Sequence, residues 1–223
     1  MKVKPARIEE GRTKYIVEHN GKDLTFIFPA IGPCTYAEAG NRIISPDLKL
    51  KRPSMSQVAS LVNTAFNSDD RYSQEIQRIL KENWLLAFTG QLYIHKEGVY
   101  IQDNPEIRNG LPFMNKSDLE IKLEQKDPSV RFTPFGFKTG EMTPKGLAKN
   151  SFVIAQAGEE GADKLAEVAG KLKYNPHLFS FESVDEQLTR VSALDSGWYS
   201  GRGLGVGGYY LGYGGGGFAL GYA

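Results

Sequence analysis

The chain has little chemistry of the kinds that are easiest to recognise. It holds a single cysteine, Cys34, so no disulfide can form within it. Its three histidines, His19, His95 and His177, lie far apart, and none has metal-ligand spacing with the cysteine or with another histidine. No run of 18 strongly apolar residues occurs before the C-terminal segment. We therefore expect no metal site and no membrane span, and a protein of the reducing cytoplasm.

Charge and sequence motifs are equally sparse. The 27 Lys and Arg residues nearly balance 26 Asp and Glu residues, so a net charge of +1 gives no general attraction to nucleic acid. The phosphate-loop pattern and the nucleophile elbow are both absent. A formal G-x-G-x-x-G occurs at Gly203, Gly205 and Gly208, but too few residues follow it to build a βαβ unit. The sequence assigns no cofactor and no catalytic residue.

Turn signals and apolar spacing indicate hairpins and helices in the first 110 residues. Asn20-Gly21 stands between two runs of aromatic and β-branched residues, and both turn residues tolerate positive φ. Apolar residues at helical spacing follow, and short polar residues stand at the helix starts. The predicted elements are a hairpin over residues 13–28, a short helix near 35–39, helices over 54–66 and 70–81, and a second hairpin over 91–101.

Residues 111–150 are less regular. Ser117 and Glu120 have the spacing of a capping box, which predicts a helix up to about residue 125. The alternation of Leu119, Ile121 and Leu123 would equally suit a strand, so both alternatives are open. Around residues 130–132 we predict an edge strand, and after it a long loop rich in Pro, Gly, Thr and Lys.

A strand–helix–strand–helix order is predicted over residues 151–195. The apolar run 151–155 resembles a buried strand, a helical stripe follows it, and residues 177–181 resemble a second strand. Val184, Leu188, Val191 and Leu194 then have helical spacing. Short connections in this order predict a right-handed parallel crossover, that is, a βαβα unit.

These elements together predict an α+β fold. A part with hairpins and helices (residues 1–110) would pack on a mixed part that contains the βαβα unit (residues 111–196). The two parts can share one core, as a single domain over residues 1–196. A glycine- and tyrosine-rich tail (residues 197–223) completes the chain.

The tail is the most unusual segment of the sequence. It contains twelve of the 25 glycines, five tyrosines and a single charge, Arg202. Ordering so much glycine is entropically costly, so either the rest of the protein or a partner must hold the segment. A glycine-turned hairpin around residues 214–217 is one possible form. Aromatic side chains suit interfaces, and the candidate interaction residues are Trp198, Tyr199, Tyr209, Tyr210, Tyr213 and Phe218.

The best candidate for a ligand site is the turn Gly158-Glu159-Glu160-Gly161, predicted between a strand and a helix. Ligands of open α/β sheets bind at such turns, and Glu182 follows at a spacing like that of a ribose-binding acid. Lys138, in the long loop before, could add a positive charge. The alternative interpretation is that both glutamates stabilise the positive end of a helix.

Residues 35–101 also have the element order of a winged helix. The exposed face of the last helix would present Gln74, Gln77, Arg78 and Lys81 to bases. The segment lacks the excess of basic residues that phosphate binding requires. The leading hypothesis is therefore a non-catalytic binding or assembly protein that contacts itself or another protein through residues 197–223. A small-ligand or nucleotide-binding enzyme and a DNA-binding protein are the alternatives.

Overall fold

The structure, a computed structural model, describes residues 7–9, 12–197, 201–208 and 214–223. Its helices are α1 (Tyr36–Ile43), α2 (Met55–Phe66), α3 (Arg71–Glu82), α4 (Lys116–Glu124), α5 (Pro144–Ala148) and α6 (Ser151–Lys171). Its strands are β1 (Arg7–Glu9), β2 (Arg12–His19), β3 (Lys22–Phe28), β4 (Ile31–Cys34), β5 (Trp84–Ile94), β6 (Gly98–Asp103), β7 (Glu106–Arg108), β8 (Leu111–Phe113), β9 (Val130–Pro134), β10 (Gly140–Glu141), β11 (His177–Phe179), β12 (Leu188–Asp195), β13 (Gly205–Gly207) and β14 (Gly217–Ala219). The predicted α+β class is confirmed.

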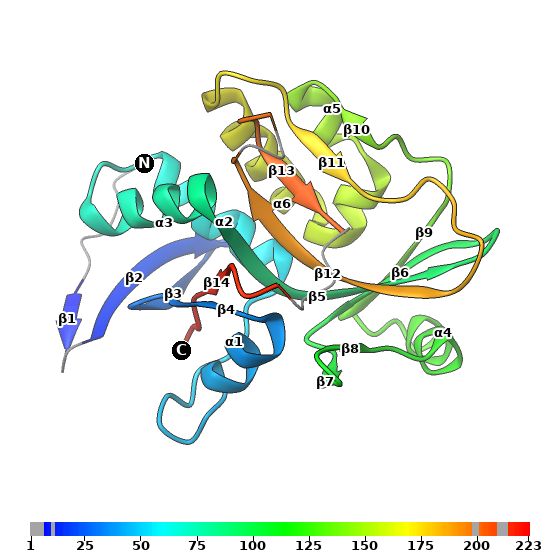
Figure 1. The fold of residues 1–223 in the computed structure, drawn as a ribbon, viewed down its shortest axis with the longest axis horizontal. Helices are drawn as coiled ribbons and strands as arrows, with labels where there is room; N and C mark the ends of the chain where they lie inside the picture. The colour runs from blue at the N-terminus through cyan, green and yellow to red at the C-terminus, as the bar shows by residue number, and fades with distance from the viewer. Residues whose placement is uncertain (1–6, 10–11, 198–200, 209–213) are drawn as a thin grey trace.

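Strand β5 is the centre of a nine-stranded sheet that forks along its length (Figure 1). On one side β5 pairs with β12 over most of its length. On the other side its first residues, Trp84 and Leu85, pair in parallel with β14, and residues 89–94 pair with β6. Strand β4 pairs with β14, and strand β9 pairs with β6. The sheet therefore has one edge at β4 and another at β9.

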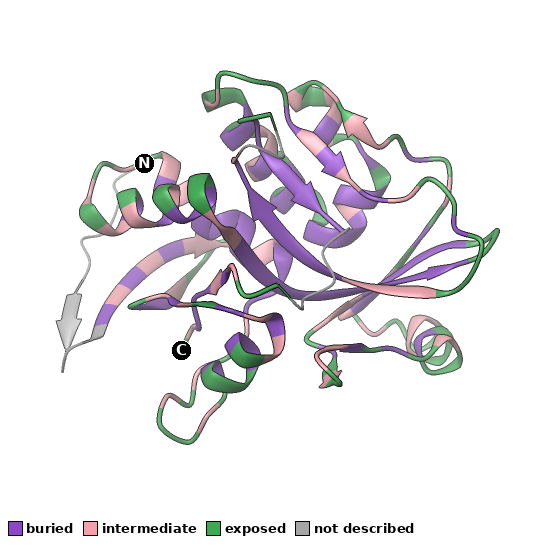
Figure 2. Ribbon diagram, viewed as in Figure 1, coloured by how far each residue is buried: buried purple, intermediate pink, exposed green. Residues whose placement is uncertain are grey.

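Successive residues of β5 enter different apolar cores. Leu85 and Ala87 belong to the core that includes side chains of α2 and α6, whereas Leu86 and Phe88 belong to a second core with α1. Figure 2 shows β5 and much of β12 as a nearly continuous buried band. Because both faces of β5 are covered, its residues are mostly apolar and do not alternate with exposed polar ones, and its polar residues Thr89 and Gln91 are buried too.

The predicted N-terminal hairpin is confirmed. Strands β2 and β3 pair antiparallel around Asn20 and Gly21, whose φ values are 50° and 72°. Tyr15 and Phe26 on this hairpin are buried in the core that α2 and α3 share. The three-stranded sheet β1–β2–β3 thus lies against the helices and outside the nine-stranded sheet.

The predicted helices of the first half and the helix near residue 120 are confirmed as α1, α2, α3 and α4. Helix α4 is capped at Asn115, whose side chain accepts the amide hydrogen of Asp118, so the helix begins slightly before the expected capping box. This outcome excludes the strand alternative for residues 119–123. The hairpin β5–β6 and the edge strand β9 are also confirmed, and β6 is the only strand that pairs with β9 in the part of the chain that the structure describes.

The predicted strand at residues 151–155 is wrong, because these residues open helix α6. The side chain of Asn150 accepts the amide hydrogens of Phe152 and Val153 and so caps a helix at this point. A short apolar run does not distinguish a buried strand from a buried helix turn. The cap residue Asn150 is the signal in the sequence that favours the helix.

The predicted helix over residues 184–194 is wrong as well. Residues 188–195 form strand β12, which pairs with β5 on one side and with β13 on the other. The register shifts between Val191 and Ser192, so the apolar residues do not keep a strict period of two. Because of this irregularity and of burial on both faces, the apolar residues of the strand have the spacing that is typical of a helix. The βαβα crossover is therefore absent, although β11 and β13 are parallel neighbours.

Two strands of the glycine-rich C-terminal segment are built into the central sheet. Strand β13 lies between β11 and β12, and β14 lies between β4 and β5. Leu204 and Val206 are completely buried. Gly208 packs closely against the core, since a Cβ there would lie 2.0 Å from Oε1 of Gln91 and 2.7 Å from the hydroxyl of Tyr93, and one of these side chains would have to shift. The rest of the protein therefore holds these parts of the tail.

The hairpin expected around residues 214–217 cannot be followed in full, because its first arm, residues 209–213, lies outside the described residues. Its second arm contains β14, whose neighbours in the sheet are β4 and β5. The nine-stranded sheet thus takes strands from all three predicted parts of the chain. Within the described ranges, no helix is both long and apolar enough to cross a lipid bilayer.

Candidate functional site

The predicted turn at residues 158–161 exists, but it joins two helical halves of α6. Gly158 has φ 73° and ψ 168°, a conformation that only glycine adopts readily, and it interrupts the helix between its apolar first half and its second half. Gly158, Glu159 and Glu160 are exposed, whereas Gly161 is buried. The glutamates therefore stand at the start of a helix, as the alternative interpretation expected, although no strand precedes them.

Arg131 caps the C-terminal end of the first half of α6. Its Nε donates to the carbonyl oxygen of Ala155 at 2.7 Å, and its Nη2 lies 3.4 Å from the carbonyl oxygen of Gln156. Asp103 accepts from the two Nη atoms at 2.6 and 3.0 Å, and Thr89 donates its hydroxyl hydrogen to the same carboxylate. A cation on the carbonyl end of a helix satisfies acceptors that the interrupted helix leaves open.

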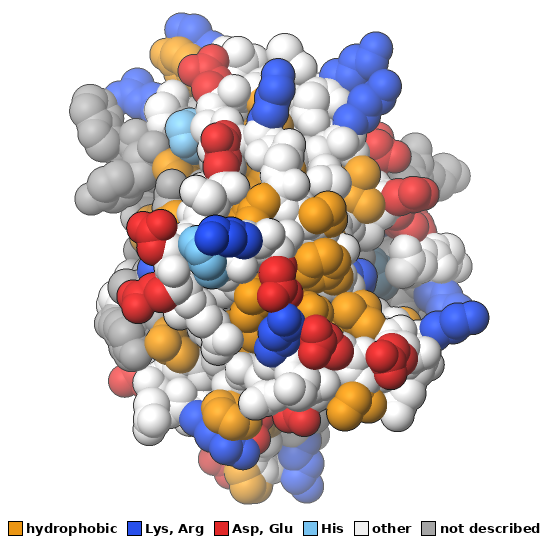
Figure 3. Space-filling view, turned by 90° about the vertical axis from the view of Figure 1, so that its right-hand side faces the viewer, with side chains coloured by type: hydrophobic (Ala, Val, Ile, Leu, Met, Phe, Trp, Pro, Cys, Tyr) orange, Lys and Arg blue, Asp and Glu red, His pale blue; other side chains and the backbone are white. Residues whose placement is uncertain are grey.

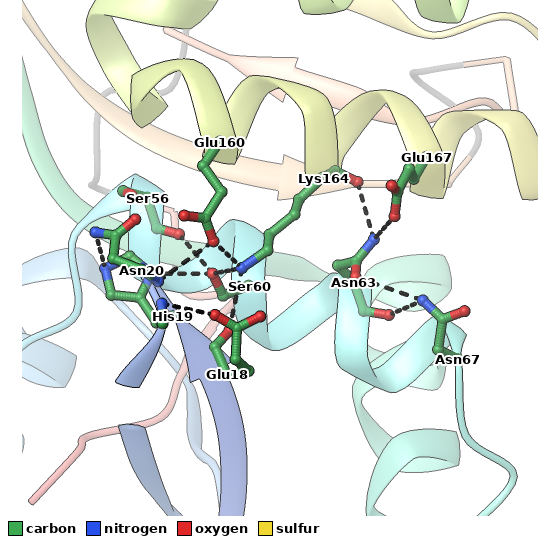
Figure 4. Close-up of polar contacts among 11 residues, drawn as sticks. Glu18, His19, Asn20, Ser56, Ser60, Asn63, Asn67, Glu160, Lys164 and Glu167 are labelled. Atoms are coloured by element: carbon green, nitrogen blue, oxygen red, sulfur yellow. Dashed lines mark hydrogen bonds and ion pairs between the residues drawn. The ribbon is translucent and has the colours of Figure 1, made fainter. Parts of the chain in front are cut away.

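Glu160 belongs to a polar cluster between the tip of the β2–β3 hairpin, α2 and α6 (Figure 4). We call His19, Asn20, Ser60, Glu160 and Lys164 the hairpin cluster. The Nζ atom of Lys164 lies 3.0 Å from the Ser60 hydroxyl and forms an ion pair with Glu160. The Nδ1 atom of His19 lies 3.0 Å from the same hydroxyl, and the backbone amide of Asn20 donates to Glu160. The cluster thus fastens the hairpin to both helices.

The cluster is one end of a polar seam along the two helices. On α6, Lys164 and Glu167 follow Glu160 at helical spacing, and Asn63 of α2 donates to Glu167 at 2.8 Å. Lys171 continues the seam with a bond to the carbonyl oxygen of Phe66. The periodicity was visible in the sequence. The residues that share it are Ser56, Ser60 and Asn63 on α2, Asn67 directly after α2, and Glu160, Lys164, Glu167 and Lys171 on α6.

Burial and charge determine the chemistry of the hairpin cluster. Burial, followed by the positive charge of Lys164, lowers the pKa of His19. The bond from Lys164 lowers the pKa of Glu160. Asn20 lies 3.2 Å from Nε2 of His19 and can donate to it, which assigns the ring proton to Nδ1 and makes Ser60 its acceptor.

A serine beside a lysine and a histidine also suggests a nucleophilic site, but the geometry opposes it. Ser60 is 1% exposed, and its hydroxyl lies 3.4 Å from the carbonyl oxygen of Ser56, to which it donates. The ammonium of Lys164 is held by a carboxylate, so it is not a neutral base. The arrangement stabilises the packing of the hairpin, and it offers no route by which a substrate could reach the hydroxyl.

The other predicted ligand residues lie elsewhere. Glu182 accepts bonds from the backbone amide and the hydroxyl of Thr139, which lower its pKa. The backbone carbonyl of the exposed Lys138 accepts from Asn150, the residue that caps α6. Asn150 is about 12 Å along the helix from Gly158, at about 1.5 Å per residue. The structure therefore brings Lys138 and Glu182 to the start of α6, and neither joins the turn at residues 158–161.

Three of the four residues expected to read bases, Gln74, Gln77 and Arg78, are engaged within the protein, and the fourth, Lys81, is exposed. Arg78 forms ion pairs with Glu75 and Glu82 on its own helix. Gln77 donates to the carbonyl oxygen of Ala65, and Gln74 to that of Asp69. Strand β5, which would be part of the wing, is the central strand of the large sheet. Two glutamates flank Arg78 on α3 and β5 is not part of a wing, so the winged-helix alternative loses its geometric support.

Metal binding also finds no support in the described residues, where no three His, Cys, Asp or Glu side chains converge. Cys34 is buried, and burial raises the pKa of its thiol. A thiol in these surroundings is a small apolar side chain and a poor nucleophile.

An exposed apolar surface lies where the sheet ends at β9. Leu92 of β5, Tyr100 of β6 and Phe132 of β9 are direct cross-strand neighbours. Their exposed fractions rise from 0% to 5% to 38% toward the edge. The rings of Tyr100 and Phe132 lie 4.8 Å apart. We call this row, together with the open side of β9, the β9 face.

Charged side chains border the β9 face. Lys116 pairs with Glu97 at 2.7 Å and with Glu120 at 3.6 Å, and the hydroxyl of Tyr100 donates to Glu120. Figure 3 shows hydrophobic side chains gathered on this end of the molecule among side chains of both charges. The sequence predicted an edge strand here, but it did not show that one ring would stay uncovered.

Of the predicted interaction residues in the tail, the structure places Phe218 in β14, where it is partly buried against the main core. Trp198, Tyr199, Tyr209, Tyr210 and Tyr213 lie outside the described residues. No protein-family model, no curated protein and no solved structure matches the chain.

Proposed function

We propose that this protein is a non-catalytic binding protein that assembles with a second copy of itself through the β9 face. The observation that carries the proposal is Phe132, a large ring that is 38% exposed on a strand that has, among the described residues, a neighbour on one side only. An edge strand is a ready template for pairing with another chain.

Strand β9 lacks one usual protection against such pairing, a free charged side chain. Edge strands commonly carry exposed charged side chains that keep other strands away. The only charged residue of β9, Arg131, is bound to Asp103 and to helix carbonyls inside its own molecule. Pro134 ends the strand and limits the pairing to the residues before it.

A second copy fits this surface for two reasons. Antiparallel pairing of β9 with itself about a two-fold axis sets Phe132 opposite Phe132, and aromatic cross-strand pairs are stabilising. A net charge of +1 causes no long-range repulsion between copies, and the ion pairs of Lys116 supply both signs beside the strand. A contact between two strands of five residues each is small, so it suits a weak dimer with a dissociation constant on the order of micromolar.

Sedimentation velocity over a range of protein concentrations tests the proposal. We expect the wild-type protein to move from the 24.7 kDa monomer to a dimer as its concentration rises, and Phe132→Asp to stay monomeric. Ile44→Asp is the matched control, because Ile44 is 53% exposed after helix α1, away from β9. It should dimerise like the wild type.

A wild-type protein that is monomeric throughout, or a Phe132→Asp variant that still dimerises, would contradict the proposal. Thermal unfolding of both variants separates a loss of assembly from a loss of folding. If Phe132→Asp does not fold, Phe132→Ser replaces it.

We further infer that the protein works in the cytoplasm. The support is Cys34, which is the only cysteine, is buried, and has a thiol pKa that burial raises. A protein adapted to an oxidising compartment commonly gains stability from disulfides, which this chain cannot form within itself.

A further inference from the structure

Arg190 is a partly buried cation with very few bonds. It lies on β12 opposite Gln91 of β5, with its guanidinium 5.3 Å from the centre of the Phe181 ring. Its Nη1 donates to the carbonyl oxygen of the preceding residue, Thr189, at 2.8 Å. Its Nε is buried and has no acceptor among the residues that the structure describes. A buried donor without an acceptor is costly and rare in proteins.

The charge of Arg190 is uncompensated as well. In the described part of the chain no carboxylate pairs with it, and burial lowers its pKa. Arg78, Arg108 and Arg131, by contrast, each form an ion pair with a carboxylate. Arginine is seldom buried without such a partner. The fold thus keeps a cation partly away from water and gives it no anion of its own.

A chain of buried hydroxyl and amide groups lies beside Arg190. The ring of Phe181 contacts both the guanidinium of Arg190 and the ring of Tyr93. The hydroxyl of Tyr93 donates to Gln91 at 2.7 Å and lies 2.8 Å from the hydroxyl of Ser180. These three polar residues are almost completely buried, so the interior beside Arg190 is polar and not purely apolar.

We propose that Arg190 binds an oxyanion, the carboxylate or phosphate group of a small ligand. The planar guanidinium offers paired N–H donors that match two oxygens of one anion. An anion would supply both the missing charge and the missing acceptors, in surroundings where low polarity strengthens the attraction. This inference goes beyond the proposed assembly, since Arg190 is no part of the β9 face.

Titration with simple anions, followed by thermal unfolding, tests the proposal. Inorganic phosphate and acetate are the two probes, and sodium chloride at matched ionic strength corrects for screening. We expect one of the two anions to raise the unfolding temperature more than chloride does, with saturation on the order of millimolar. Whether phosphate or acetate acts at the lower concentration distinguishes the two classes of ligand.

Arg190→Gln should weaken this binding at least about tenfold, because a hydrogen-bonded charge is lost. Arg78→Gln is the matched control and should bind like the wild type, since two glutamates already engage Arg78. Equal shifts in wild type and Arg190→Gln, or no shift beyond that of chloride, would overturn the proposal.

A second measurement serves if Arg190→Gln does not fold. The side-chain Nε–H resonance of Arg190 in the wild-type protein should move as phosphate or acetate is added and should not move with chloride. A resonance that stays in place with all three salts contradicts the proposal.

Discussion

Lys164 and Arg190 are both cations held against the protein interior, and they differ in the acceptors within their reach. Lys164 has the carboxylate of Glu160, the carbonyl oxygen of Glu18 and the hydroxyl of Ser60. Arg190 has one backbone carbonyl, and its Nε donor is unused. The first pattern is that of a residue that stabilises packing, and the second leaves a place for a ligand.

The comparison teaches that proximity of reactive side chains is a weaker sign of function than unsatisfied bonding. The hairpin cluster unites serine, lysine, histidine and glutamate, yet each of its polar groups is engaged within the protein. Arg190 has no such constellation around it, and it has bonding capacity that the described protein does not use. Substitutions at or near Lys164 and Arg190 test this difference.

The largest effect is expected at Gly208, which touches the polar neighbours of Arg190. Gly208→Ala would place its Cβ 2.0 Å from Oε1 of Gln91, a side chain that is completely buried. We expect it to lower the free energy of unfolding by about 2–4 kcal/mol, through crowding and a broken buried hydrogen bond. Urea denaturation measures this change.

Gly170→Ala is the matched control on the helix that carries Lys164. A Cβ at Gly170 would meet no atom within 4 Å, and alanine favours a helix, so stability should rise by about 0.5–1 kcal/mol. If Gly208→Ala unfolds at the wild-type urea concentration, the side chain of Gln91 can move aside and the surroundings of Arg190 are looser than the structure implies.

Removal of each cation tests the comparison directly. Lys164→Met should lower the free energy of unfolding by about 1–2 kcal/mol, because Ser60 and the carbonyl of Glu18 lose their donor. The contribution of Glu160 is small, since its side chain is largely in water. Arg190→Met keeps the apolar stem and removes a poorly bonded charge. Without an added anion it should change stability by no more than about 0.5 kcal/mol.

Urea denaturation in a buffer without phosphate or carboxylate measures both variants. A larger loss of unfolding free energy in Arg190→Met than in Lys164→Met would contradict this expectation. It would make Arg190 a structural residue and remove the reason to expect a ligand there.

The sequence was sufficient where local chemistry decides the structure. Asn20-Gly21 specified the first hairpin, and Asp70 caps α3 as its position suggested. It was insufficient for β12, where burial on both faces and a register shift hid the period of a strand. Arg190 escaped notice because an arginine in a sequence does not reveal whether a carboxylate lies near it in space.

The glycine-rich segment shows the same limit of prediction from the sequence. Its composition indicated correctly that something must hold it, but not that β13 and β14 would be strands of the central sheet. Close approaches such as that of Gly208 to Gln91 depend on residues more than a hundred positions away. No local pattern contains that information.

The smallest effect concerns the pH dependence of the hairpin cluster. Burial and the charge of Lys164 lower the pKa of His19 below its ordinary value of 6.5. The unfolded chain therefore binds more protons than the folded protein as the pH falls below about 6.5, and stability declines with acidification. The lowered pKa of Glu160 acts in the same direction but at lower pH, below its ordinary value of 4.5.

Urea denaturation at several pH values between about 7.5 and 5 isolates the contribution of the histidine, since the carboxylates titrate mostly below this range. His19→Gln should show a smaller loss of stability on acidification than the wild type. Ser60→Ala is the matched control: it removes a partner of the ring but leaves the burial and the Lys164 charge, so it should keep most of the wild-type slope. An unchanged slope in His19→Gln would mean that protonated His19 fits the cluster as well as the neutral ring does.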